Sequence, residues 1–169
     1  MKSVDKYLFQ ALDNYPYWLE GTIESLDYAL SYDDKNTTAL CLYGRIHAEQ
    51  LQDYEGAKNY FQQAISIDIH SLEVYPYYIE TLLLNEDFEE AQKLIDFALT
   101  IKGVKKVEIK LKLVSLLERQ LQFKKATKLL KKVKLELISS DYNHQIEETE
   151  KRLKLKLETN SNDKKKKRK

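Results

Sequence analysis

The side chains that most often carry out catalysis or bind metal ions are few in this chain and lie far apart. Its 169 residues include three histidines, His47, His70 and His144, and one cysteine, Cys41. No histidine has a cysteine or carboxylate partner at the spacing that zinc sites use, so we expect no metal site and a packing role for His47. Cys41 has no base beside it in the sequence and is expected to be a small buried residue. A glycine-rich phosphate loop, a Gly-x-Ser-x-Gly turn and paired carboxylates are also missing, so we expect a protein that is not an enzyme and needs no cofactor.

Tyrosine is frequent, with twelve copies, and two stretches that contain it are similar: Tyr15–Trp18 reads Tyr-Pro-Tyr-Trp and Tyr75–Tyr78 reads Tyr-Pro-Tyr-Tyr. Most of these rings are expected to pack between helices. Tyr77 differs because it lies off the helical stripe that carries Tyr75 and Tyr78. A tyrosine at such a position offers a partner both ring area and a polar hydroxyl, so Tyr77 is a candidate contact residue.

Charge is divided unevenly along the chain, although the net charge is only +1. Residues 1–101 contain 6 basic and 18 acidic residues, a balance of −12, whereas residues 102–169 contain 22 basic and 9 acidic residues, a balance of +13. The second part holds five lysines between Lys124 and Lys132 and a basic run at residues 164–169. This pattern predicts, as an alternative function, association with nucleic acid or another anionic partner. With no aromatic residue interleaved, only non-specific nucleic-acid contact is expected, and opposite charges also predict weak self-association that fades with salt.

Three stretches repeat at a step of 34 or 35 residues: Tyr54–Asp68, Phe88–Lys102 and Phe123–Leu137, with a weaker copy at Leu19–Asp33. Each of the three opens with an aromatic residue, and the copies then share a small column, a bulky apolar column and a second small column. In order, these columns hold Thr22, Ala57, Ala91 and Ala126; Leu26, Phe61, Ile95 and Leu130; and Ala29, Ala64, Ala98 and Val133. A fixed period of this length is typical of stacked helical repeats.

Each repeat is predicted to be a pair of antiparallel helices, in units at about residues 3–35, 36–69, 70–103 and 104–138. The stretch Leu72–Leu84, for example, has apolar residues at helical spacing. The small columns let the second helix of each pair approach its neighbours closely. A further helix at about residues 140–158 has one apolar stripe and is expected to cap the last repeat. The polar segment 159–169 is expected to be a disordered basic tail.

These columns resemble the tetratricopeptide repeat family, which has an aromatic residue at the turn followed by alanine, a large residue and alanine on the second helix. The best match is Tyr54–Ala64, and Phe88–Ala91 with Ala98 is nearly as good. The resemblance covers about residues 3–138. It implies an all-α fold, a right-handed solenoid of about four helix-turn-helix repeats with a capping helix.

The resemblance also implies a function, because members of this family bind peptides or partner proteins in a concave groove lined by the first helices. The residues expected to contact the partner lie off the packing stripes of those helices: Arg45 and Glu49; Tyr77, Glu80 and Leu83; and Lys112, Ser115 and Arg119. One subgroup grips acidic chaperone tails with a clamp of cationic residues, but Glu73, Tyr77 and Glu80 stand where those cations would be. We therefore expect a non-enzymatic scaffold or adaptor protein without that clamp.

The sequence also gives an expectation for the cellular compartment of the protein. No apolar run approaches the roughly 18 residues that a membrane span needs. The first residues, Met1–Lys6, lack the apolar segment of a secretory signal. A single cysteine excludes an internal disulfide, so a cytoplasmic protein is expected.

Overall fold

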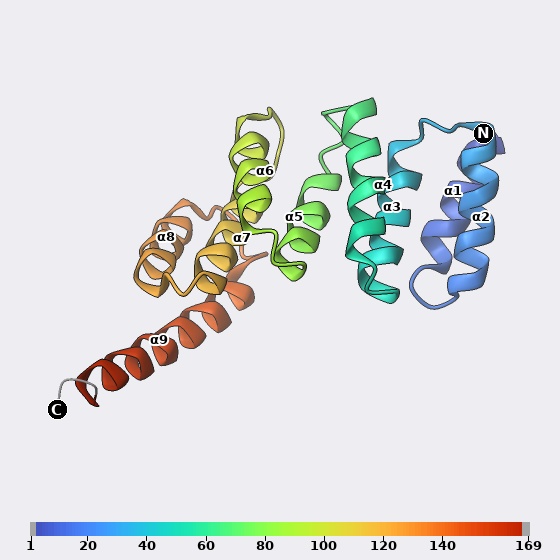
Figure 1. The fold of residues 1–169 in the computed structure, drawn as a ribbon. Helices are drawn as coiled ribbons and strands as arrows, with labels where there is room; N and C mark the ends of the chain where they lie inside the picture. Colours follow the sequence, from blue (N-terminus) through green and yellow to red (C-terminus); the bar gives the residue numbers. More distant parts are fainter. Residues whose placement is uncertain (1–2, 167–169) are drawn as a thin grey trace. The chain divides into compact units, whose positions relative to one another are not determined.

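The structure is a computed structural model that describes residues 3–166, with side chains described for residues 6–160. All regular secondary structure in this range is helical, as expected for an all-α protein (Figure 1). No helix in the described range is long and apolar enough to cross a membrane.

The helices follow the predicted alternation of first and second members. The first helices are α1 (Ser3–Asn14), α3 (Thr37–Arg45), α5 (Val74–Leu84) and α7 (Lys106–Arg119). The second helices are α2 (Leu19–Tyr32), α4 (Tyr54–Ile67), α6 (Phe88–Thr100) and α8 (Phe123–Glu136). A π-helical segment, η1 (Ile46–Gln50), continues α3, and α9 (Asn143–Lys166) follows α8. All four second helices begin at the first residue of one of the four stretches that repeat in the sequence.

The chain divides into two compact units, one up to Glu86 and one from Asp87 onward. In the first unit α1 packs on α2 and α3 packs on α4, while α5 contacts both α3 and α4. In the second unit α7 packs on α6 and α8, and α9 packs on α8. The boundary falls inside the predicted repeat at residues 70–103, so its two helices, α5 and α6, belong to different units.

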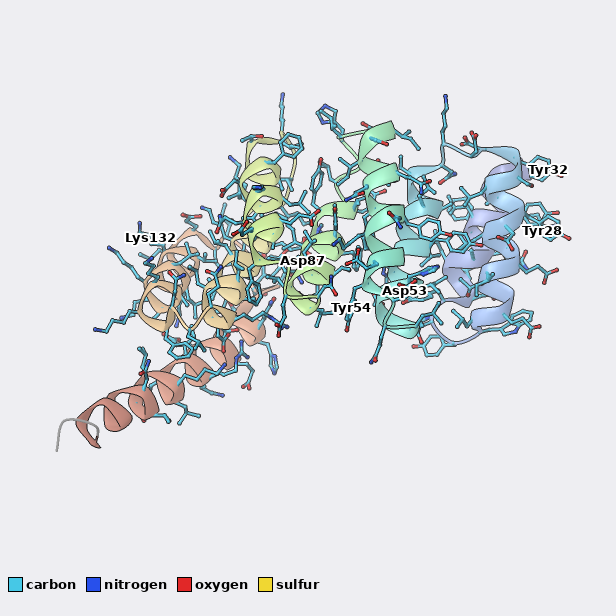
Figure 2. The ribbon with its side chains drawn as sticks, in the orientation of Figure 1. Tyr28, Tyr32, Asp53, Tyr54, Asp87 and Lys132 are labelled. Atoms are coloured by element: carbon cyan, nitrogen blue, oxygen red, sulfur yellow. The ribbon has the colours of Figure 1, made fainter. Side chains whose placement is uncertain are left out.

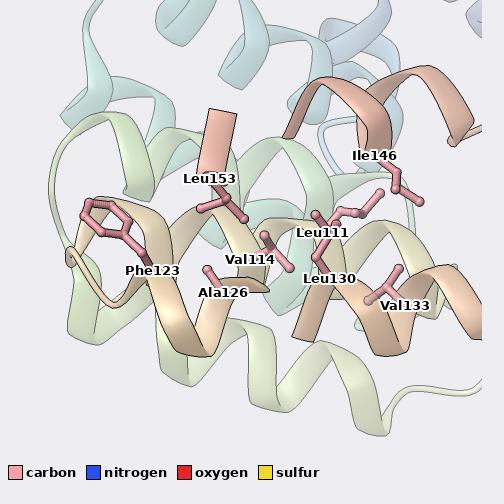
Figure 3. Packing of buried hydrophobic residues seen from close by; sticks show 8 residues of the cluster. All are labelled: Leu111, Val114, Phe123, Ala126, Leu130, Val133, Ile146 and Leu153. Carbon is pink, nitrogen blue, oxygen red and sulfur yellow. The ribbon is translucent and has the colours of Figure 1, made fainter. Parts of the chain in front are cut away.

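The aligned columns lie in the interior, which explains their residue types. Each residue of the two small columns is 0% exposed: Thr22, Ala57, Ala91, Ala126, Ala29, Ala64, Ala98 and Val133. The bulky column is buried as well, with Phe61 at 0% and Leu130 at 2% exposure. In the second unit these residues join a core formed by Leu111, Val114, Phe123, Ala126, Leu130, Val133, Ile146 and Leu153 (Figure 3).

The helix α9 covers this core but is longer than the sequence analysis expected. Ile146 and Leu153 are each 1% exposed, and Tyr142 and Leu157 pack beside them, so the predicted apolar stripe is confirmed. The expected helix end at residue 158 and disorder from 159 differ from the structure, in which α9 continues to Lys166. No glycine or proline interrupts this stretch, so no residue type in it strongly opposes a helix. Residues 167–169 of the predicted tail lie outside the described range.

A buried carboxylate also ties α9 to α7, which the apolar pattern did not predict. The side chain of Glu118 on α7 is 7% exposed. It accepts hydrogen bonds from Arg152 Nε at 2.8 Å, Arg152 Nη2 at 2.9 Å and Lys156 Nζ at 2.6 Å. The apolar stripe and this ion cluster together hold α9 on the second unit.

Three residues with positive φ angles occur at turns that precede the helices α4, α6 and α8. Gln52, Glu86 and Leu121 have positive φ angles of 54°, 62° and 60°. Each lies two residues before a second helix, so the three recur at the 34- or 35-residue step. An L-residue in this left-handed region carries a steric cost of about 1–2 kcal/mol.

We expect Glu86→Gly to raise the free energy of unfolding, because glycine adopts positive φ without that steric cost. Glycine also loses more backbone entropy on folding, about 0.5–1 kcal/mol, so the net gain should be at most about 1 kcal/mol. Chemical denaturation measures the difference. The matched control is Gln63→Gly at an exposed site inside α4. A change to glycine in the interior of a helix should destabilise the protein by about 1 kcal/mol. Equal losses in both variants would contradict a strained turn.

Candidate functional site

Arg45, at the end of α3, lies between two tyrosine rings. Its guanidinium carbon Cζ is 4.7 Å from the centroid of the Tyr15 ring and 4.3 Å from that of the Tyr77 ring. Tyr15 belongs to the turn after α1, and Tyr77 lies on the first turn of α5. A planar guanidinium stacks well on aromatic faces, so three separate elements of the first unit meet at one side chain.

Glu49 completes this arrangement from the π-helical segment η1. Its carboxylate accepts hydrogen bonds from Arg45 Nε at 3.0 Å and from Arg45 Nη2 at 3.4 Å, and also from the Tyr15 hydroxyl. The π-helical turn is marked by the bond from Leu51 N to the carbonyl of Ile46, five residues earlier, at 3.2 Å. This segment lies at the C-terminal end of α3, where π-turns commonly end helices. We call Tyr15, Arg45, Glu49 and Tyr77 the tyrosine–arginine cluster.

The protonation of the cluster follows from its surroundings. Burial raises the pKa of the Tyr15 phenol, and the hydrogen bond to Glu49 and the negative charge of Glu49 raise it further. The hydroxyl therefore stays protonated at neutral pH and acts as a donor to Glu49. The carboxylate balances the charge of Arg45, so the cluster is ordered before any partner arrives.

The cluster is nevertheless accessible. Tyr77 is 36% exposed, and the side chains of Arg45 and Glu49 are 24% and 40% exposed. A guanidinium has five N–H donors, and Glu49 accepts from two of the nitrogen atoms that carry them. The remaining donors and the Tyr77 ring suit a partner that brings a carbonyl or carboxylate oxygen and a flat or apolar group.

Cys41 and His47, whose side chains belong to reactive types, have structural roles. Cys41 on α3 is 3% exposed, as expected, and burial raises the pKa of its thiol to about 12. It is therefore not a thiolate at neutral pH. His47 packs against Tyr60, with ring centroids 5.1 Å apart. Its Nδ1 lies 2.8 Å from Oδ2 of Asp53.

Asp53 links this histidine to the start of α4. Figure 2 labels Asp53 and the first residue of that helix, Tyr54. Its Oδ1 accepts a hydrogen bond from Gly56 N at 3.0 Å, so Asp53 is the N-terminal cap of α4. The pKa of the Asp53 carboxyl is lowered mainly by the hydrogen bond from the Gly56 backbone N–H. The hydrogen bond to His47 is the second cause. Among residues with described side chains, no three histidine, cysteine, aspartate or glutamate residues are grouped so that they could hold a metal ion.

The structure places the other predicted contact residues on α5 and α7. Leu83 is 0% exposed, so the expectation that it contacts a partner is wrong. The reason is that α5 is apolar on most of its circumference and is buried accordingly at Val74, Tyr75, Tyr78, Ile79, Thr81, Leu82 and Leu83. Glu80 is half-buried on α5. Lys112 and Ser115 are half-buried and Arg119 is exposed, all three on α7 in the second unit.

Arg45, Glu49 and Tyr77 were among the predicted contact residues, and Tyr15 was not. A signal was present in the two similar Tyr-Pro-Tyr stretches, since each contributes one ring to the cluster. The rings come from different positions of the motif, the first tyrosine at Tyr15 and the second at Tyr77, so motif alignment alone does not pair them.

Comparison with models of known protein families finds no match, and comparison with curated proteins finds none. The resemblance to tetratricopeptide repeats therefore stays a prediction that rests on the residues of this chain.

Proposed function

We propose that this protein is a non-enzymatic scaffold or adaptor, a right-handed solenoid of tetratricopeptide-like repeats. In this proposal it holds a peptide or partner protein on the surface that α1, α3 and α5 contribute to the first unit. The observation that carries the proposal is the tyrosine–arginine cluster, in which a half-buried arginine is stacked between two rings and remains accessible.

The repeat interpretation is supported by three independent regularities. The second helices begin at Leu19, Tyr54, Phe88 and Phe123. The small columns are fully buried. The turn residues with positive φ recur at the same step. Stacked helix pairs of this kind typically use extended surfaces to bind partners.

The physics of interfaces supports the choice of surface. Arginine and tyrosine are enriched among the residues that contribute most to binding energy. Because Glu49 and the two rings already hold Arg45 in place, little side-chain entropy remains to be lost on binding. A neighbouring bond from Thr38 Oγ1 to Glu73 Oε1, 3.1 Å long, links α3 to the start of α5.

We expect Tyr77→Ala and Arg45→Ala each to weaken partner binding about tenfold or more, because each removes part of a preorganised contact. Partners would first be captured with the tagged wild-type protein and identified by mass spectrometry. Binding of one purified partner would then be measured by calorimetry. Tyr77→Phe, which keeps the ring, should bind almost as well as wild type.

The matched control is Gln63→Ala, an exposed change on α4. Circular dichroism checks that every variant is folded. If both Tyr77→Ala and Arg45→Ala bind the purified partner as the Gln63→Ala control does, the cluster is not the binding surface.

A further inference from the structure

A second surface, on α8 of the second unit, has an unusual concentration of charge. Five of its lysines are exposed: Lys124, Lys125, Lys128, Lys131 and Lys132. At 3.6 residues per turn, the other four lie within about 60° of Lys128 around the helix axis, and the set extends about 12 Å along it. We call these five residues the lysine face; Figure 2 labels Lys132 on it.

Within residues 6–160, the lysine face differs from two other lysines of the second unit, Lys110 and Lys134, in having no acidic partner. Lys134 Nζ lies 3.0 Å from Glu150 Oε2, and Lys110 pairs with Glu136. None of the five lysines of the face makes an ion pair with a residue whose side chain is described. Five like charges this close repel one another, so an anionic partner would stabilise the surface.

An apolar hollow adjoins the N-terminal end of the lysine face. It has a volume of about 440 Å³. It is lined by Leu121, Gln122, Phe123, Lys124, Lys125, Leu157 and Asn160. A neighbouring hollow of about 420 Å³ shares Leu121, Phe123 and Asn160. Leu121 is 71% exposed, which leaves a large apolar side chain open to solvent at its edge. Lys124 and Lys125 belong to both the hollow and the lysine face, so the two features form one continuous surface.

The lysine face and the apolar hollow together favour one kind of anionic partner over others. Nucleic acid would use the cations, but Phe123 is only 9% exposed and no other aromatic residue of α8 offers a base a stacking platform. Phosphates alone, from nucleic acid or lipid headgroups, would leave the apolar hollow unused. A peptide with several carboxylates and one bulky apolar side chain would use both parts.

We infer that the lysine face and the apolar hollow form a docking site for an acidic segment of a partner protein that carries one apolar anchor residue. The anchor occupies the hollow between Leu121, Phe123 and Leu157, and the carboxylates follow the lysines along α8. Exposed ion pairs contribute little individually, so the anchor supplies much of the affinity and the lysines favour acidic partners. This site goes beyond the proposed function, because it lies in the other unit and uses different residues.

The test uses the full-length protein and a peptide labelled with fluorescein at its C-terminus, acetyl-Phe-Glu-Asp-Glu-Glu-Asp-Glu, in fluorescence anisotropy. We expect it to bind about tenfold more tightly than the same peptide with serine in place of phenylalanine, because an apolar side chain is buried. Leu121→Asn should remove most of this difference. Asparagine tolerates the positive φ at this position, so the fold should be kept.

The lysine face is tested with the triple variant Lys124→Glu, Lys128→Glu and Lys131→Glu, which should weaken binding about tenfold or more. The charge-matched control is Lys102→Glu, Lys105→Glu and Lys106→Glu, three exposed residues of the same unit. It changes the net charge equally but should affect binding much less.

Three results would overturn the inference. Equal binding of the phenylalanine and serine peptides would mean that the hollow is not used. Equal losses in the two triple variants would mean that only net charge attracts the peptide. Tighter binding of oligothymidine, or of vesicles of phosphatidylcholine and phosphatidylserine, without any effect of Leu121→Asn would identify a phosphate-binding surface instead.

Discussion

Gly44→Ala is expected to lower the free energy of unfolding of the first unit by about 1–2 kcal/mol, because the new methyl group has no room. A Cβ atom at this position would lie 2.5 Å from Cε1 of Phe61 and 2.7 Å from its Cδ1 and Cζ. Phe61 is 0% exposed and stacks on Tyr78 with ring centroids 5.6 Å apart, so its ring cannot move toward solvent. Overpacking therefore outweighs the helix propensity that alanine gains over glycine, about 0.5–1 kcal/mol.

Gly21→Ala is the matched control. A Cβ at Gly21 would also lie 2.5 Å from a ring atom, Cε3 of Trp18. Trp18, however, is 55% exposed and can rotate toward water. This variant should be no less stable than wild type. Urea denaturation followed by circular dichroism compares the two, and a loss at Gly21 as large as that at Gly44 would mean that neighbour mobility does not decide the outcome.

Arg152→Ala is expected to destabilise the second unit by about 1–3 kcal/mol, because it leaves the buried Glu118 carboxylate with fewer hydrogen bonds. Arg152 supplies two of the three charged hydrogen bonds to Glu118, and Lys156 supplies the third. The expected loss lies below that of a fully buried pair because the Arg152 side chain is 47% exposed. Glu118→Leu should cost less, since both cations can then turn toward solvent.

The pH dependence provides a second measurement. Burial raises the pKa of the Glu118 carboxyl, but the hydrogen bonds and charges of Arg152 and Lys156 together lower it below its ordinary value. A carboxyl with a lowered folded pKa stabilises the protein above its unfolded pKa, about 4.3. That contribution is lost as the pH falls through the folded pKa.

Wild type should therefore lose stability in this acidic window, and Arg152→Ala should lose less there, because its Glu118 pKa is less depressed. Hydrogen exchange of the α9 amides would locate the effect. An α9 protected equally in wild type and Arg152→Ala at neutral pH would show that the ion cluster does not hold the helix.

The features of the fold that could be predicted depend on residues that are close together in the sequence. Helix starts at Leu19, Tyr54, Phe88 and Phe123 could be predicted because each repeat needs small residues where its second helix approaches its neighbours. The burial of Cys41 follows from its residue type, and the apolar stripe of α9 follows from the spacing of apolar residues within that segment. Each of these features depends on residues within one or two helical turns of one another, which is the range that a sequence pattern records.

Other features depended on residues that are close only after folding. The sequence indicated that Arg45 and Tyr77 lie off the packing stripes, but the stack that joins them includes Tyr15, thirty residues before Arg45 in the sequence. Leu83 was expected on the surface, yet it lies four residues after Ile79 on the same buried side of α5. Glu118 accepts a hydrogen bond from Arg152, which lies thirty-four residues later in the sequence. A helical period specifies which side of a helix is apolar, whereas the identity of a polar partner depends on how the helices pack, and only the tertiary structure decides that.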